Sequence, residues 1–505
     1  MPKLTIDGVL VEVEQGSTIL DAAKKIGIEI PALCFREGYQ PSTSCMVCIV
    51  KVRNRLIPSC ATIAEDGMVV ESETDEIHEA RHTALELLLS DHTGDCIAPC
   101  HTICPANMNI SLMIRQIIEG DLRNAIITVK RDIPLPAVLG RICPAPCEKG
   151  CRRGFYDNPV SICLLKRYVA DVDLASEHQY LPQCKSANGK RVAIIGAGPA
   201  GLSAAYYLPQ KGYACTIFDD HEKPGGALQY AVPEDRLPRA ALDAEIDVIR
   251  RLDAEFHLNT KIDDIKSLQA DYNAVLIAIG QSDNPFLKSI KVDRNTLQTN
   301  IEGIFAAGNA LGRRTNMAIR SVADGKLAAS SIDQYLSGVP ITGYRKQFTT
   351  RIGKLTDVEL QRFVANVCKY QRIEPSGNNG FSEQEAYSES LRCLHCDCRK
   401  ADNCKLRDYS DINSADPNKY KGDRRLFEQQ YQHKDIIYES GKCISCGLCI
   451  QIALKAREPL GLSFIGRGFN VKVDVPFNRT IEEGLQKVAV ECVEACPTGA
   501  LAFKE

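Results

Sequence analysis

The sequence predicts a multidomain chain that combines α+β and α/β architecture, and three observations support this. The chain has 505 residues, enough for about three to four domains. Most of its 23 cysteines fall into tight groups at opposite ends of the chain, which flank a cysteine-poor middle at roughly 185–390. That middle begins with an apolar strand that enters a glycine-rich turn, a pattern typical of a parallel α/β sheet.

The cysteine spacing indicates iron–sulfur clusters, because thiolates two or three residues apart can converge on one metal centre. Disulfides would need an oxidising compartment. The first residues, MPKLTIDGVLVEVEQG, lack the charged and apolar regions of a signal peptide. No stretch reaches the roughly 18 apolar residues of a membrane span. We therefore expect a soluble, cytoplasmic protein with reduced thiols, and structural zinc stays open for one cysteine group.

Charge and composition indicate which partners to expect and where the domains begin and end. The net charge is −3, and basic and acidic residues are mixed along the chain without a basic stripe, so nucleic acid is not an expected partner. The hydrophobic fraction of 44% suffices for ordinary cores. Motifs and composition place domain boundaries at 1–78, 79–185, 186–340, 341–435 and 436–505.

The first domain is predicted to be a [2Fe-2S] ferredoxin-like β-grasp domain. Residues 3–14 alternate apolar and polar around Asp7-Gly8, which predicts a hairpin, and 18–26 predicts a short helix. Four cysteines follow in the plant-type order, one early thiol, a CxxC pair and a distant fourth: Cys34, Cys45, Cys48 and Cys60. Zinc is the alternative for this set.

This segment resembles the N-terminal region of the large iron–sulfur subunit of respiratory NADH dehydrogenase and of NAD-linked iron hydrogenases. The resemblance continues through 86–96, which includes His92 and Cys96. It implies that His92 ligates a [4Fe-4S] cluster. The alternative is a solvated surface histidine.

The second domain is predicted to be helical. Cys104-Pro, helical spacing over 112–125 and the string Cys143-x3-Cys147-x3-Cys151 resemble the N-terminal helical domain of the glutamate synthase small subunit and of dihydropyrimidine dehydrogenase. The resemblance implies two [4Fe-4S] clusters with interleaved ligands. One would use Cys96, Cys100 and Cys151, and the other would use Cys104, Cys143 and Cys147.

Each of these two clusters needs a fourth ligand. His92 is the candidate for the first. At the second, the relatives carry Glu or Gln where this chain has Lys166, a cation that cannot ligate. Cys163 lies three residues earlier, on the same helical face, and we expect it to replace the missing ligand. A buried, inert thiol is the alternative.

The third domain is predicted to be a Rossmann-like FAD-binding domain. The strand from Arg191 enters a turn whose glycines permit close approach of a pyrophosphate, and an acid follows at the end of the next strand, where it can accept ribose hydroxyls. Further blocks match the glutamate synthase family. The expected FAD residues are Gly196, Gly198, Gly201, Asp219, Gly226, Arg236, Gly308, Asn309 and Ala318.

The resemblance also shows a departure. In that family a second dinucleotide domain, for NADPH, is inserted where this chain has only residues 281–298. Such a domain needs on the order of 100 residues. We therefore expect FAD without a nicotinamide domain.

Two cysteine groups follow in the C-terminal part. Cys393, Cys396, Cys398 and Cys404 are expected to form one [4Fe-4S] site, with tetrahedral zinc as the alternative. Cys443, Cys446, Cys449 and Cys496 match one cluster of a bacterial ferredoxin-like domain. The second cluster of that fold would need ligands where Gln486, Ala489 and Ala453 stand, so Cys492 is expected to be a leftover thiol.

Together these resemblances imply an electron-transfer subunit of a multi-subunit oxidoreductase of the NAD-linked hydrogenase, formate or aldehyde dehydrogenase type. Implied partners are an NADH-binding flavoprotein subunit, a small [2Fe-2S] subunit and a catalytic dehydrogenase or hydrogenase subunit. The sequence leaves open whether the subunit also takes part in electron bifurcation with ferredoxin. The alternatives are a self-sufficient NAD(P)H-dependent oxidoreductase and a conduit with an empty flavin fold. Catalytic residues are unknown, because no acid–base or nucleophilic constellation stands out.

Overall fold

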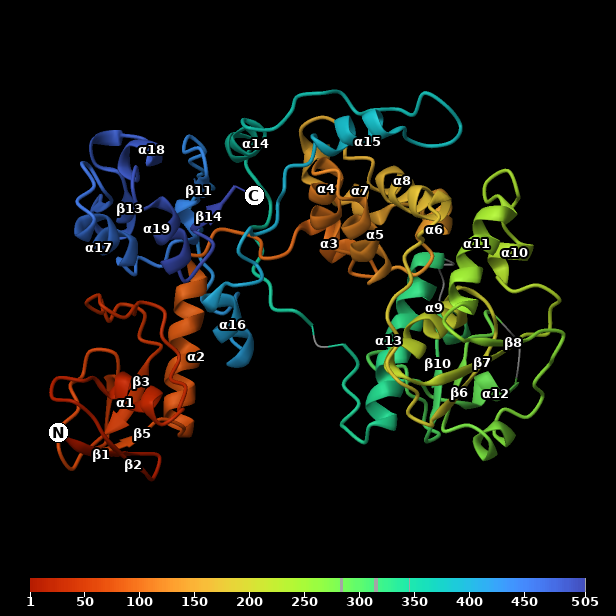
Figure 1. Ribbon diagram of the computed structural model, residues 1–505, viewed down its shortest axis with the longest axis horizontal. Helices are drawn as coiled ribbons and strands as arrows, with labels where there is room; N and C mark the ends of the chain where they lie inside the picture. Colours follow the sequence, from red (N-terminus) through yellow and green to blue (C-terminus); the bar gives the residue numbers. More distant parts are fainter. Residues whose placement is uncertain (282–284, 313–316, 345, 505) are drawn as a thin grey trace. The chain divides into compact units, whose positions relative to one another are not determined.

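The computed structural model describes residues 1–281, 285–312, 317–344 and 346–504 (Figure 1). The chain divides into two compact units. Unit 1 comprises Met1–Ile97, Gln347–Asn366 and Cys396–Glu505, and unit 2 comprises Ala98–Lys346 and Val367–His395. The segment 341–435, predicted as one connecting domain, is therefore shared between the two units.

Unit 1 begins with a five-stranded sheet in the order β2-β1-β5-β3-β4. Its strands are β1 (Lys3–Ile6), β2 (Val9–Glu12), β3 (Ile49–Val52), β4 (Arg55–Pro58) and β5 (Val69–Glu71), and helix α1 (Ile19–Lys25) accompanies them. Asp7 and Gly8 both have positive φ, as a two-residue hairpin turn requires. Thr18 and Asp21 form a capping box at α1. The predicted hairpin and helix are confirmed.

The rest of unit 1 consists of helices and two small antiparallel sheets, β11–β14 and β12–β13. The strands are β11 (Ile436–Tyr438), β12 (Ser463–Ile465), β13 (Lys472–Asp474) and β14 (Leu501–Phe503). The helices are α2 (Asp75–Ser90), α14 (Asp357–Val364), α16 (Lys405–Ile412), α17 (Leu448–Lys455), α18 (Ile481–Gly484) and α19 (Ala489–Ala495). Helices α17 and α19 pack together over a buried apolar core.

Unit 2 begins with a helical region. Its helices are α3 (Pro99–Ile103), α4 (Ile110–Ile118), α5 (Leu122–Lys130), α6 (Pro136–Ile142), α7 (Pro146–Lys149), α8 (Ile162–Ala175) and, later in the chain, α15 (Glu383–Ser390). The helical spacing predicted over 112–125 belongs to two helices rather than one. Gly120 turns the chain with φ +75°, and Asp121 then caps α5 by accepting a hydrogen bond from the Asn124 N–H.

The remainder of unit 2 is a parallel five-stranded sheet in the order β10-β9-β6-β7-β8. Its strands are β6 (Arg191–Ile195), β7 (Ala214–Phe218), β8 (Glu255–His257), β9 (Ala274–Ile277) and β10 (Ile304–Ala306). The accompanying helices are α9 (Pro199–Tyr207), α10 (Ala227–Tyr230), α11 (Arg239–Arg250), α12 (Pro285–Ser289) and α13 (Ala318–Leu336). This is the predicted doubly wound architecture.

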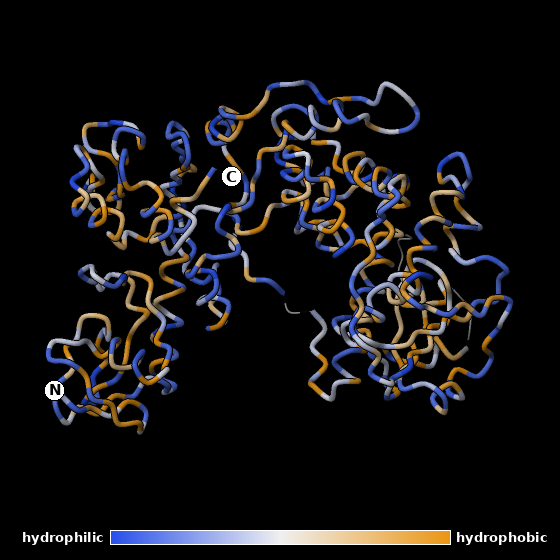
Figure 2. The backbone as a smooth tube through the Cα atoms, in the orientation of Figure 1, coloured by the Kyte–Doolittle hydropathy of each residue, from blue (hydrophilic) through white to orange (hydrophobic). Residues whose placement is uncertain are grey.

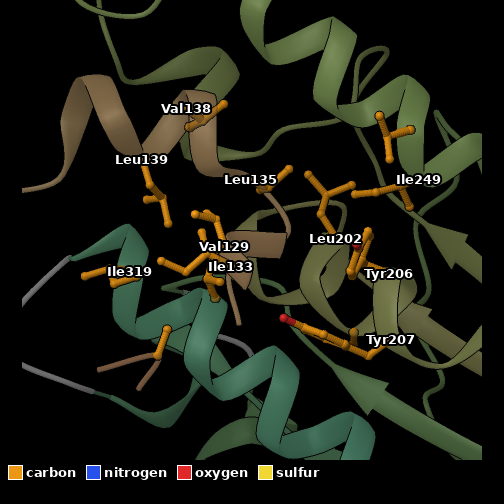
Figure 3. Close-up of a cluster of buried hydrophobic side chains, with 14 of the residues drawn as sticks. Val129, Ile133, Leu135, Val138, Leu139, Leu202, Tyr206, Tyr207, Ile249 and Ile319 are labelled. Carbon is orange, nitrogen blue, oxygen red and sulfur yellow. The ribbon is translucent and has the colours of Figure 1, made fainter. Parts of the chain in front are cut away.

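The helical region and the parallel sheet share one hydrophobic core. Figure 3 shows Val129, Ile133 and Leu139 of the helical region facing Leu202 and Tyr206 of the sheet region. The carboxylate of Glu245, on α11, accepts the N–H groups of Ala137 and Val138 at 2.8 and 2.9 Å. This packing joins the helical region to the parallel-sheet region within unit 2.

Hydrophilic and hydrophobic stretches are interleaved along the chain (Figure 2). Among the described residues, no helix combines the length and apolar character that crossing a bilayer would require.

Candidate functional site

The four N-terminal thiols converge in one buried site. Cys34, Cys45, Cys48 and Cys60 are each at most 2% exposed. Hydrogen bonds from the thiols of Cys45 and Cys60 hold the pKa of Cys34 far below its ordinary value. Backbone N–H groups of Cys45 and Ser44 also donate to its sulfur. Such N–H donors stabilise thiolates, so the loop suits a [2Fe-2S] cluster.

Four C-terminal thiols surround a cavity in the ferredoxin-like part. Cys443, Cys446, Cys449 and Cys496 line it together with apolar side chains, including Tyr438 and Leu448. Burial raises the pKa of the Cys443 thiol to about 11, and a bound metal centre would favour its thiolate form. Cys492 is turned elsewhere, since its Sγ donates to the Cys449 carbonyl at 3.8 Å. That these four thiols hold one cluster stays a prediction.

A third group of thiols gathers in unit 2 around the first turn of α8. The thiols of Cys143 and Cys147 both hydrogen-bond Cys163, which lowers the pKa of Cys163 well below its ordinary value. Cys104 lies within electrostatic range of Cys163. The three predicted ligands and the predicted replacement ligand are therefore neighbours. Their assignment to a [4Fe-4S] cluster stays a prediction, which this geometry supports.

Lys166 adds a buried positive charge to this group. It is 3% exposed, and its Nζ lies 3.8 Å from Cys163 Sγ, one helical turn away. Burial alone would lower the pKa of Lys166, but electrostatic interactions with Cys163, Cys143 and Cys147 outweigh it and raise the pKa above the ordinary value. The lysine that replaces a ligand of the relatives therefore becomes a fixed cation beside the thiolates.

We expect Lys166→Met to lower the reduction potential of the cluster held by these thiols by about 100 mV. A unit charge at about 6 Å, at an effective dielectric constant of about 20, contributes roughly 2–3 kcal/mol, and its loss disfavours the reduced, more negative cluster. An EPR-monitored redox titration measures the shift. Lys149→Met is the matched control, because Lys149 is exposed on the neighbouring α7. Equal potentials in both variants would contradict the prediction.

The thiols predicted for the other helical-domain cluster are divided between the units. Cys100 and Cys151 lie in unit 2, whereas Cys96 and His92 lie in unit 1. Within unit 2, α3 packs on α7, where a Cβ on Gly150 would come within 2.0 Å of Ile103. Cys393 also lies in unit 2 and packs against the same hydrophobic core as Cys100 and Cys151.

The predicted set Cys393, Cys396, Cys398 and Cys404 is divided too, because only Cys393 lies in unit 2. Tetrahedral zinc brings its sulfur ligands to within about 4 Å of one another. Over the described ranges, the one group of three or more ligand atoms that lie within 4.8 Å of one another is Asp219, Asp220 and His221. The choice between a [4Fe-4S] cluster and zinc for these thiols stays a prediction.

The glycine-rich turn follows β6 as predicted. Gly196 has φ +107°, and a Cβ there would lie 2.5 Å from the Ala278 carbonyl oxygen. A Cβ on Gly201 would lie 2.0 Å from the Gly196 carbonyl oxygen, whereas one on Gly198 would meet no atom within 4 Å. The turn thus uses Gly196 and Gly201 for close packing, and Gly198, which precedes α9, leaves open space for a phosphate group.

Asp219 stands at the end of β7, as expected, and is 7% exposed. One carboxylate oxygen accepts the Ala197 N–H at 2.6 Å, so the acid also holds the glycine turn in place. Gly226 approaches the turn closely, since a Cβ on it would lie 2.9 Å from Gly198 Cα. Arg236 is exposed, and its predicted cofactor contact stays a prediction.

The second predicted FAD segment starts at Gly308, in a 3-10 helix (Gly308–Leu311), and continues into α13, which begins at Ala318. The Gly308 N–H donates to Asp324 at 3.2 Å. Asn309 is half-buried beside it. Sequence reasoning missed Asp324, a buried acid on α13. Its position directly before Gly325, inside the matched block, was the available signal.

A cavity of 340 Å³ lies where these elements meet the helical region of unit 2. Residues 102–105 and Asn107, which include Cys104, line one side. Arg320, Ala323 and Asp324 of α13 line the other. The cavity falls in the size range of small-molecule and cofactor sites.

The connection between β9 and β10 is short, as the sequence predicts. Its described part holds α12 and two isolated bridges, one between Val292 and Thr299 and one from Gln298 to Phe305 of β10. Residues 282–284 belong to the short segment that stands where the glutamate synthase family has its NADPH domain. These three residues lie outside the described residues. The described residues of this connection are too few for a second dinucleotide-binding domain.

Comparison with protein families identifies three domains. Residues 2–75 match a 2Fe-2S iron–sulfur cluster binding domain, 73–178 match dihydropyrimidine dehydrogenase domain II with its 4Fe-4S cluster, and 194–253 match an NAD(P)-binding Rossmann-like domain. The predicted [2Fe-2S], [4Fe-4S] and Rossmann-like domains are confirmed. The family description names NAD(P) for the last domain, so FAD remains a proposal.

Curated relatives are oxidoreductase chains. The chain is 39% identical over 207 residues to the NADP(+)-dependent formate dehydrogenase subunit beta of Moorella thermoacetica, covering 36% of this chain and 29% of that protein. It is 36% identical over 190 residues to the dihydropyrimidine dehydrogenase subunit PreT of Salmonella typhimurium, covering 37% and 46%. It is 33% identical over 190 residues to the glutamate synthase small chain of Mycobacterium tuberculosis, covering 37% and 39%.

These matches confirm the resemblance to the glutamate synthase small chain and related subunits. The chain spans less than half the length of each of these relatives, so their whole activities do not transfer directly. A solved NAD+-reducing [NiFe]-hydrogenase aligns over 100% of this chain and 87% of its own, with 12% identity and a TM-score of 0.32, a similarity that carries no argument about function.

Proposed function

We propose that this chain is an iron–sulfur flavoprotein electron-transfer subunit of a multi-subunit oxidoreductase, of the NAD-linked hydrogenase, formate or aldehyde dehydrogenase type. The observation that carries the proposal is the cavity of unit 2. The loop of Cys104 lines one side, and α13, whose Asp324 holds Gly308, lines the other. A cluster motif and a flavin motif therefore meet at one cavity, as electron exchange between them requires.

Bound clusters would supply one-electron transfer and bound FAD would supply both one- and two-electron exchange. The protein's part is to hold these groups. Gly198, at the N-terminus of α9, leaves room for the pyrophosphate, and the buried thiols replace water around the iron. We propose one FAD, one [2Fe-2S] and up to four [4Fe-4S] clusters, held by the residues identified from the sequence.

Unit 1 supports a relay of its own. Cys34 and Cys45 of the N-terminal site share a hydrophobic core with Cys446 of the ferredoxin-like site. The Ser42 hydroxyl, in the N-terminal loop, donates to the Cys446 carbonyl at 2.6 Å. Two thiol sites packed on one core lie close enough for clusters in them to exchange electrons, so we propose that these two sites are consecutive.

The relatives' names describe subunits of dehydrogenases, which supports a multi-subunit assembly for this chain. We propose an NADH-binding flavoprotein subunit, a small [2Fe-2S] subunit and a catalytic dehydrogenase or hydrogenase subunit. All 23 cysteines are free thiols, which agrees with a reducing compartment, and we propose the cytoplasm.

An anaerobic titration tests the proposal. The purified, cluster-replete chain is mixed with NADH or NADPH while the flavin absorbance is followed. We expect no bleaching by either nucleotide and full bleaching by dithionite, because the described residues hold one parallel sheet with one glycine-rich turn for a dinucleotide. The partner subunits should then restore reduction by the nucleotide.

The alternative is a self-sufficient NAD(P)H-dependent oxidoreductase of the glutamate synthase small-subunit type. The NAD(P)-binding description of the family matched by residues 194–253 favours it. Rapid bleaching of the flavin by either nucleotide, without partners, would establish this alternative and overturn the subunit proposal. A chain that binds no flavin under anaerobic purification would overturn both.

A further inference from the structure

Three thiols from two distant segments meet inside unit 1. Cys96 follows α2, while Cys398 and Cys404 precede α16. The Cys398 N–H donates to the Cys96 carbonyl oxygen at 3.3 Å, which joins the two segments directly. All three side chains are buried, at 7%, 8% and 6% exposed. Both Cys398 and Cys96 lie within electrostatic range of the Cys404 thiol.

Hydrogen-bond donors and a closely packed glycine surround these thiols. The Thr350 hydroxyl lies 3.3 Å from Cys96 Sγ, and the Thr350 N–H donates to the same sulfur at 3.5 Å. A Cβ on Gly499 would lie 2.2 Å from Cys398 Sγ, so a larger residue there would displace the Cys398 side chain. Thiolates bound to iron need such polar donors and close backbone approach.

A buried cation balances the charge of the thiols. Lys442 is 4% exposed, forms an ion pair with Glu439 and lies within electrostatic range of Cys398. His92 also lies within electrostatic range of Lys442. Its imidazole therefore belongs to the same neighbourhood as the Cys398 thiol. Glu439 offsets the charge of buried Lys442, and a metal-bound thiolate at Cys398 would stabilise that charge further.

The spacing of the thiols indicates a cluster rather than a single ion. Across the described part of the chain, these three sulfurs do not form a group within 4.8 Å of one another, which a single tetrahedral ion would need. Corner ligands of a [4Fe-4S] cube are farther apart than that. The site therefore has the ligand type and burial of a cubane cluster, and its sulfurs are not gathered as they would be around a single tetrahedral ion.

We propose that Cys96, Cys398 and Cys404 hold one [4Fe-4S] cluster, with His92 as its fourth ligand. This grouping differs from both groupings expected from the sequence, which joined Cys96 to Cys100 and joined Cys398 to Cys393. It rests on the proposed function only in that both require iron–sulfur clusters in this chain. The new cluster lies in unit 1, with the thiols of the ferredoxin-like site nearby, since Cys404 is within electrostatic range of Cys496.

Iron counting in single and double variants of the full chain tests the grouping. Cys96→Ala and Cys398→Ala should each remove about four iron atoms, and the double variant should remove no more than either alone, because both residues serve one cluster. Loss of about eight iron atoms in the double variant would overturn the proposal. Cys492→Ala is the control, a buried thiol of the same unit with no cluster assigned, and it should keep all its iron.

The fourth ligand is tested by a variant that should keep the fold and the iron. His92→Cys replaces an imidazole ligand by a thiolate, so the iron content should stay constant while the EPR signal and reduction potential of one cluster change. That same signal should be the one missing from Cys398→Ala. Unchanged spectra in His92→Cys would overturn the assignment of His92, and loss of the same signal in Cys396→Ala would give the position to Cys396. These readouts need neither flavin nor partners, so failure of the proposed function leaves them intact.

Discussion

Replacing Cys163 by alanine is expected to remove about four iron atoms from each chain while the fold is kept. Cys163 accepts hydrogen bonds from the Cys143 and Cys147 thiols and contacts the buried Lys166 ammonium. A cubane cluster that loses one of four protein ligands is exposed to solvent and degrades. Alanine fills the first turn of α8 without strain, because it has the highest helix propensity.

Iron and acid-labile sulfide analysis after anaerobic purification measures the loss. The control is Cys215→Ala, which removes a thiol that is also buried in unit 2 but lies on β7. It should keep its full iron content. If Cys163→Ala retains its iron as well, Cys163 is an inert buried thiol, and the cluster of Cys104, Cys143 and Cys147 has another fourth ligand.

Alanine at Gly201 and alanine at Gly198 should have different effects, although both glycines belong to one turn. A Cβ at Gly201 would come within 2.0 Å of the Gly196 carbonyl oxygen, so Gly201→Ala must displace backbone and should destabilise the folded unit by about 1–3 kcal/mol. A Cβ at Gly198 would meet no protein atom within 4 Å. Gly198→Ala should therefore fold normally and bind flavin about tenfold or more weakly, because the methyl group enters the space proposed for the pyrophosphate.

Thermal unfolding with and without FAD separates the two effects. Gly201→Ala should unfold at lower temperature even without flavin. Gly198→Ala should match the parent without flavin and lose the stabilisation that added FAD provides. Gly377→Ala, where a Cβ also meets no atom within 4 Å, is the neutral control. Unaltered flavin affinity in Gly198→Ala would place the dinucleotide elsewhere or show that none binds.

Local signals predicted the N-terminal part of the fold well. The hairpin of 3–14 and the helix near 18–26 follow from alternation, a turn dipeptide and a capping residue, all of which act between near neighbours in the chain. The predicted helix over 112–125 was divided into two. Its apolar spacing continues across the break, but Gly120 and Asp121 supply a stop and a cap that locally outweigh it.

In the candidate sites, too, some contacts could be predicted from the sequence and others could not. The proximity of Cys163 to Cys143 and Cys147 could be anticipated, since helical spacing places Cys163 on the face of Lys166, where the relatives carry a ligand. Asp324 could not be anticipated as readily, because its partner, Gly308, is on another element and their contact depends on how α13 packs.

The sequence by itself determined the kind of chemistry in this protein, because CxxC-type spacings and a strand–glycine–helix motif are local and hold their ligand geometry within a few residues. Which thiols can share a site depends on the tertiary structure. Cys393 and Cys398 are five positions apart in the sequence yet belong to different units, whereas Cys96 and Cys398 are joined by a hydrogen bond across some 300 residues. Thiols meet where helices and loops pack, and packing is set by contacts that sequence spacing does not record.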